Sequence, residues 1–173
     1  MADLHDLTLA DAASAIARRD LSPVDLVRAL FAHIDGVEPK VRAWARLRRE
    51  ESLAEAARLE RLAAGGKLLG PLHGVPLGVK DIYFTAGWET SAGSRILAGF
   101  VPAYDSTVVA RLRAAGAIII GKAHTTEFAM MDPAPTRNPW NLAHTPGGSS
   151  SGSAAAVAAR MVPGVCARFQ GLR

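Results

Sequence analysis

The first third of the chain carries apolar residues at the spacing of amphipathic helices. In the stretch "LSPVDLVRALFAHID", one helix face collects Leu26, Val27, Leu30, Phe31 and Ile34. Ser22 is a suitable N-cap for this helix, and Pro23 fits its first position. An earlier helix is predicted through "AASAIARR", because Thr8 followed by Asp11 matches an N-cap with an acidic third residue.

A third helix is predicted over residues 42–62, where a glycine pair at 65–66 ends it. In this stretch Arg46 and Glu50 stand four positions apart, as they do on a solvated helix face with paired charges. The pattern therefore predicts that the chain opens with helices only, over about residues 1–66.

From about residue 67 to 163 the pattern changes to short apolar strands that alternate with helices. Residues 75–79 suit a strand that delivers Lys80 and Asp81 at its end. A helix is expected over residues 106–115, and the apolar stretch 117–120 reads as a buried strand. Strand, helix and strand in series predict an α/β fold with a right-handed parallel crossover. The alanine run 153–159 is helix-prone.

Composition and charge narrow the class of protein. Apolar residues make up 49% and charged residues 21% of the 173 residues, which is the composition of an ordinary globular domain. No apolar run is long enough to span a bilayer, so we expect a cytoplasmic protein without membrane contact. The formal charge of +4 suggests a nucleic-acid-binding protein, but the arginines alternate with acidic residues, which argues against this function.

Two short motifs resemble catalytic loops without their chemistry. Residues 116–122, "GAIIIGK", have the spacing of a phosphate-binding loop, but its interior is apolar and Ala123 replaces the required Ser or Thr. "GSSSG" has the pattern of a nucleophile elbow around Ser150. Neither an acid nor a histidine follows Ser150, so a Ser-His-Asp hydrolase is excluded within this chain.

The remaining reactive side chains give one candidate. Cys166 is a lone cysteine with apolar neighbours and is expected to be inert. Among the five histidines, His73, His124 and His144 lack metal-ligand spacing, so no metal is expected. Lys80 follows an apolar strand, and burial there would keep it neutral enough to act as a base for a serine. The alternative is an exposed lysine that pairs with Asp81.

"GPLHGVPLGVKD" followed by "PGGSSSGSAAAVAA" resembles the amidase signature family, whose members hydrolyse carboxamides through a Ser-Ser-Lys triad. The resemblance runs from about Leu7 to Pro163. It implies N-terminal helices followed by a mixed or parallel sheet covered by helices. It also implies that Lys80 is the triad lysine and that Ser149 is the bridging serine, preceded by a cis peptide bond. A small-molecule amide is the implied substrate, and no cofactor is implied.

The resemblance breaks off near the end of the chain. The family's nucleophilic serine is expected near Arg173, but no serine follows Ser153. We therefore expect residues 1–163 to be the N-terminal part of a truncated amidase domain, residues 164–173 to be a divergent tail, and the chain alone to be inactive. Two alternatives stay open. In the first, the complete protein is an enzyme, either a hydrolase or the amidase-type subunit of a glutamyl-tRNA(Gln) amidotransferase. In the second, the chain is a non-catalytic fragment or interaction module.

Overall fold

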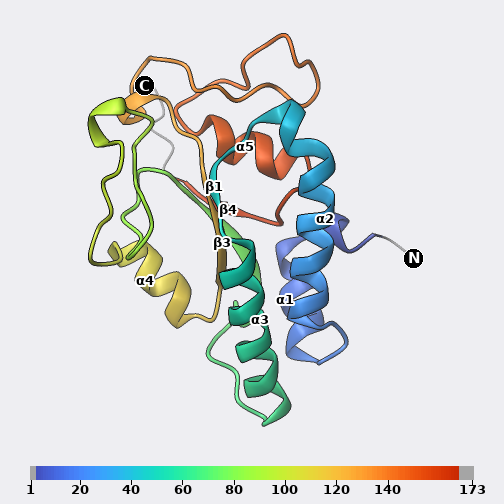
Figure 1. Ribbon diagram of the computed structural model, residues 1–173. Coiled ribbons are helices and arrows are strands. Elements are labelled where there is room, and N and C mark those ends of the chain that lie inside the picture. Colours follow the sequence, from blue (N-terminus) through green and yellow to red (C-terminus); the bar gives the residue numbers. More distant parts are fainter. Residues whose placement is uncertain (1–2, 168–173) are drawn as a thin grey trace.

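The computed structural model describes residues 3–167, which form a four-stranded mixed sheet with helices on both of its faces (Figure 1). The strand order is β1-β3-β2-β4. The strands are β1 (Trp44–Leu47), β2 (Pro76–Lys80), β3 (Ile118–Ala123) and β4 (Val165–Cys166). Strand β2 runs parallel to both β3 and β4, whereas β1 pairs with β3 in the antiparallel direction.

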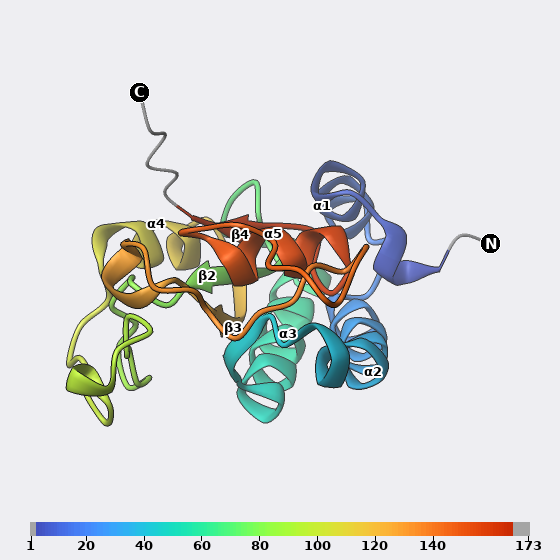
Figure 2. The ribbon, with the colours of Figure 1, turned by 90° about the horizontal axis from the view of Figure 1, so that it is seen from above.

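Five α-helices and three 3-10 turns precede or connect these strands within the described part of the chain. The helices are α1 (Leu9–Ala17), α2 (Pro23–Val41), α3 (Arg49–Ala64), α4 (Thr107–Ala114) and α5 (Ser151–Ala158). The short turns are η1 (Leu4–Asp6), η2 (Arg95–Leu97) and η3 (Glu127–Ala129). Helix α4 lies across the sheet from α2 and α3 (Figures 1 and 2). No helix among residues 3–167 is long and apolar enough to cross a membrane.

The predicted helix starts and the predicted crossover are confirmed. The Ser22 hydroxyl accepts hydrogen bonds from the first amides of α2, with Pro23 in the first turn, and the Thr8 hydroxyl accepts one from the Asp11 amide. Strands β2 and β3 are parallel neighbours joined through α4, with Leu77 opposite Ile119. The predicted fold class, a mixed α/β sheet covered by helices, is therefore confirmed. The prediction that residues 1–66 contain helices only is wrong, because strand β1 lies among them.

The prediction of one helix over residues 42–62 is wrong in its first part. Arg42 ends α2 in the left-handed conformation, with φ of 57°, and Trp44–Leu47 forms edge strand β1 before α3 begins. Both carboxylate oxygens of Glu38 accept backbone hydrogen bonds at this bend, from Ala43 and Trp44. Tertiary packing therefore overrides the helical pattern, and Arg46 pairs with Glu89 rather than with Glu50.

Packing of the Trp44 indole explains why this segment is extended. A side chain at Gly78 would lie 2.7 Å from the Trp44 ring, and one at Gly121 would lie 2.8 Å from it. The ring therefore lies flat against the glycines of β2 and β3, within a core cluster that α2, α3 and α5 build on this face. A helix over residues 42–47 would remove the indole from this position.

The first residues of the predicted tail belong to the sheet. The Gly78 amide donates to the Gly164 carbonyl, and Val165 pairs with Gly78 in the parallel register. Residues 164–167 are thus part of the described fold, whereas 168–173, including the predicted nucleophile position near Arg173, lie outside the described residues.

Candidate active site

Lys80 ends strand β2 and points toward the start of α5. Its ammonium nitrogen lies 2.7 Å from the Ser149 hydroxyl oxygen, although the two residues are 69 positions apart in the chain. Side chains alternate along a strand, so Lys80 shares the face of Gly78, against which the Trp44 ring packs. The structure thus brings together both residues that the sequence singled out.

Contacts of the backbone around Ser149 hold this residue in place. The peptide bond between Gly148 and Ser149 is cis, as the family resemblance implies. The Ser149 carbonyl accepts hydrogen bonds from the Thr126 amide at 3.0 Å and from the Thr125 hydroxyl at 3.1 Å. On the helix side, the Ser151 hydroxyl donates to the Gly147 carbonyl at 2.6 Å. These contacts fix the backbone on both sides of the Ser149 hydroxyl.

The Lys80 side chain is fully buried, and this burial lowers the pKa of its ammonium group because the charged form loses its hydration. The alternative of an exposed lysine paired with Asp81 is wrong. Asp81 instead forms an ion pair with Lys122, at 3.1 Å between Oδ1 and Nζ. A buried lysine with a lowered pKa and a hydroxyl within hydrogen-bond distance is equipped to accept a proton.

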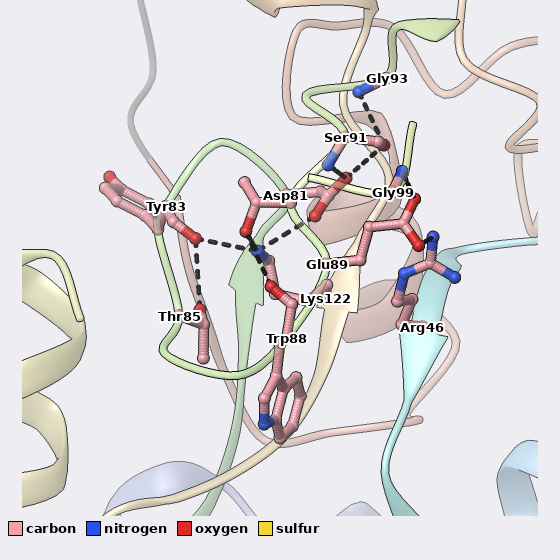
Figure 3. Close-up of polar contacts among 11 residues, drawn as sticks. Arg46, Asp81, Tyr83, Thr85, Trp88, Glu89, Ser91, Gly93, Gly99 and Lys122 are labelled. Carbon is pink, nitrogen blue, oxygen red and sulfur yellow. Dashed lines mark hydrogen bonds and ion pairs between the residues drawn. The ribbon is translucent and has the colours of Figure 1, made fainter. Parts of the chain in front are cut away.

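Lys122 is the second fully buried lysine, and a bulge in β3 decides where it points. The register between β2 and β3 shifts by one residue between Leu77 and Gly78, so Ile120 and Gly121 both face the Trp44 side. Lys122 is thereby turned to the opposite face, where it donates to the Tyr83 carbonyl at 2.8 Å (Figure 3). It also donates to the Thr90 hydroxyl at 2.6 Å. The sequence pattern predicts no role for Lys122, because a bulge leaves no periodic signal.

A cavity of about 330 Å³ opens beside Lys80 and Ser149. Its other lining residues are apolar: Ile82, Ala92, Phe128, Ala129 and Met130. Three of these five, Ala92, Phe128 and Ala129, hold left-handed backbone angles, with φ of 51°, 47° and 58°. Such angles are costly for residues with a side chain and persist where surrounding contacts enforce them. The backbone conformation of the cavity wall is therefore enforced by the contacts around it.

A second cavity, of about 460 Å³, meets the first at Ser149. It also shares Ala129 and Met130 with the first cavity, and it extends along Gly147 and Gly148 toward Thr145. Ser149 thus lines both cavities, and space is open on more than one side of this residue.

The other candidate residues lie outside this site. Both ring nitrogens of His73 are engaged, since Nδ1 accepts from the Leu69 amide and Nε2 lies 3.0 Å from the Leu59 carbonyl. Burial lowers the pKa of His124 and raises the pKa of the Cys166 thiol, which disfavours a reactive thiolate. Within residues 3–167 the candidate metal-ligand cluster is Asp3, His5 and Asp6, a group at the surface that includes none of the three histidines singled out from the sequence.

Comparison with known proteins adds the family. A family model described as Amidase matches residues 25–166. The glutamyl-tRNA(Gln) amidotransferase of Geobacter metallireducens contains a subunit that is 48% identical over 164 residues, which are 91% of this chain and 34% of that subunit. The peptide amidase of Stenotrophomonas maltophilia superposes with a TM-score of 0.83 at 37% identity, over 91% of this chain and 35% of its own. A fatty acid amide hydrolase reaches a TM-score of 0.85 at 25% identity, over 92% and 29%.

The chain spans about a third of the length of the curated relatives it matches. The family match reaches Cys166 and so includes β4, beyond the limit at Pro163 that the sequence motifs suggest. Family model, sequence identity and fold agree: the chain belongs to the amidase signature family and corresponds to the N-terminal part of that family's domain.

Proposed function

We propose that Lys80 and Ser149 are the general base and the proton relay of a Ser-Ser-Lys amidase, which hydrolyses the C–N bond of a carboxamide. The observation that supports this most strongly is the 2.7 Å contact between the Lys80 amine and the Ser149 hydroxyl, made by a fully buried lysine. In its neutral form, that amine accepts the hydroxyl proton across the same contact.

This geometry supports a proton relay from the nucleophile through Ser149 to Lys80. Ser149 passes its proton to Lys80 and takes one from the nucleophilic serine of the complete domain, which then attacks the amide carbon. The leaving amine receives the proton, and water releases the acyl group. Because Thr125 and Thr126 hold the Ser149 carbonyl, the hydroxyl between base and nucleophile keeps its direction during both transfers.

The substrate class follows from what the relatives' names share. They describe an amidotransferase, a peptide amidase and a fatty acid amide hydrolase. The chemistry common to all three is a carboxamide, and we extend that class to the complete protein. We also propose that the 173-residue chain is inactive alone, since no serine follows Ser153 to serve as nucleophile. A non-catalytic module is the second candidate, and it rests on the same missing serine.

A chimera tests the proposal. Residues 1–163 are joined to the remaining part of the Geobacter metallireducens relative, and ammonia release is measured with glutamine, a peptide amide and a fatty acid amide. We expect the 173-residue chain to release no ammonia above its Lys80→Met variant, and the chimera to turn over at least one of the three amides. Lysine-dependent turnover by the chain alone would contradict its inactivity. A folded chimera without turnover would contradict the roles of Lys80 and Ser149.

A further inference from the structure

The network around Asp81 connects the buried ion pair to the wall of the cavity beside Lys80. One oxygen of Asp81 faces Lys122, and the other accepts hydrogen bonds from the Ser91 amide at 3.1 Å and the Ser91 hydroxyl at 2.7 Å. The Ser91 hydroxyl in turn accepts from the Gly93 amide at 3.2 Å. Figure 3 shows the Asp81 carboxylate between Lys122 and the loop that carries Ser91 and Gly93.

The backbone continues this connection to the cavity. The Asp81 carbonyl accepts a hydrogen bond from the Ala92 amide at 3.0 Å, and the Ala92 carbonyl accepts one from the Phe128 amide at 2.8 Å. Ala92 and Phe128 both line the cavity beside Lys80 and Ser149, and both hold left-handed backbone angles. Residues in such angles depend on their hydrogen bonds to stay there.

Asp81 directly follows Lys80, so the two side chains leave the strand end on opposite sides. Lys80 meets Ser149 on one side, and Asp81 meets Lys122 and Ser91 on the other. Apart from Lys80 itself, the residues that line its cavity carry no ionisable side chain. The Asp81–Lys122 pair therefore reaches the site through Ala92 and Phe128 rather than by direct contact.

We propose that Asp81 and Lys122 are a positioning pair for amide hydrolysis, which holds the cavity wall at Ala92 and Phe128 against Lys80 and Ser149. This role rests on the proposed function of Lys80 as the base. The pair holds this part of the wall against the amine, so that Lys80 stays buried although the cavity opens beside it. Loss of the pair loosens Ala92 and Phe128, admits water and lets Lys80 titrate like an exposed lysine.

The titration of Lys80 tests this role in the 173-residue chain. The sequence contains four lysines, of which Lys40 and Lys67 are exposed and Lys80 and Lys122 are buried, so a chain labelled with 13C-lysine gives an NMR spectrum simple enough to follow each one. The variant is the double substitution Asp81→Asn/Lys122→Met, which removes one charge of each sign and leaves the net charge unchanged. We expect the Lys80 midpoint of this variant to rise above the wild-type value, toward the ordinary value for lysine.

The matched control removes another ion pair, which joins Glu89 of the same loop to Arg46 of strand β1. Arg46→Gln/Glu89→Gln also leaves the net charge unchanged, and that pair has no hydrogen bond to Ala92 or Phe128. We expect its Lys80 midpoint to stay at the wild-type value. Ser91→Ala is the milder variant should the double variant not fold, and it is expected to move the midpoint in the same direction.

The outcomes separate this role from the proposed function. The wild-type Lys80 midpoint is expected to be lowered, and a rise of this midpoint in the double variant but not in the control supports the positioning pair. A folded double variant with an unchanged Lys80 midpoint overturns the pair and leaves the function standing. Ser91→Ala decides between the same two outcomes only if the double variant does not fold. A wild-type Lys80 that titrates at the value of about 10.4 that is ordinary for lysine overturns the proposed function, and this role falls with it.

Discussion

Replacing Lys80 with methionine in the chimera is expected to lower kcat by about 10²–10⁴-fold, which is the usual contribution of a positioned general base. Methionine fills a similar volume in the buried site but cannot accept the Ser149 proton across the 2.7 Å contact. Steady-state ammonia release measures the loss, and circular dichroism of the same sample confirms that the variant is folded.

Two comparisons make this result specific. Ser149→Ala interrupts the relay and is expected to fall in the same range of about 10²–10⁴-fold, whereas Lys67→Met, at an exposed lysine, leaves kcat unchanged. Because a lysine base acts only when neutral, kcat/KM should decline as the pH falls below the Lys80 pKa. A Lys80→Met chimera that keeps wild-type turnover would show that another group accepts the proton.

Gly152→Ala is expected to destabilise the 173-residue chain by about 3 kcal/mol, near the upper end of the usual cost of overpacking. Gly152 lies in the first turn of α5, where a methyl group would lie 2.2 Å from the Ala43 carbonyl oxygen and 2.4 Å from the His124 amide nitrogen. Both are backbone atoms, and the Gly152 amide also donates to the His124 carbonyl. Helix α5 must therefore move away from the sheet. Urea unfolding followed by circular dichroism measures the loss.

Gly36→Ala is the matched control for this substitution. Gly36 lies exposed inside α2, and a methyl group there would have no atom within 4 Å. Its replacement is expected to raise stability by about 0.5–1 kcal/mol, because alanine favours the helix. Equal stability of Gly152→Ala and the wild type would contradict the close approach of α5 to the strand end, and with it the placement of Ser149.

Much of the fold and the two central site residues could be predicted from the sequence because their signals are local. The caps at Thr8 and Ser22 lie next to the helices they start. Lys80 and Ser149 each lie in a motif that resembles the amidase signature and that predicts a role for the residue. The structure places the two side chains in contact, and their roles stay a proposal.

The parts that escaped prediction depend on contacts between distant segments. Trp44 lies in a stretch with a helical pattern, and it becomes part of a strand because its ring packs on the bare backbone of Gly78 and Gly121. Lys122 follows an apolar run, and the sequence predicts it only as the end of a strand. In the structure, the bulge turns its side chain toward Asp81. Neither event leaves a periodic mark in the sequence.

The pKa of Lys80, measured by 13C NMR in the wild-type 173-residue chain, tests the central claim most directly. Burial is expected to place the Lys80 midpoint below the value of about 10.4 that is ordinary for lysine, and a short lysine peptide measured under the same conditions serves as the reference. The Lys80 signal should also shift in Ser149→Ala, because the hydroxyl touches the amine. A Lys80 that titrates like the lysine of the reference peptide and does not respond to Ser149→Ala would contradict its role as the base.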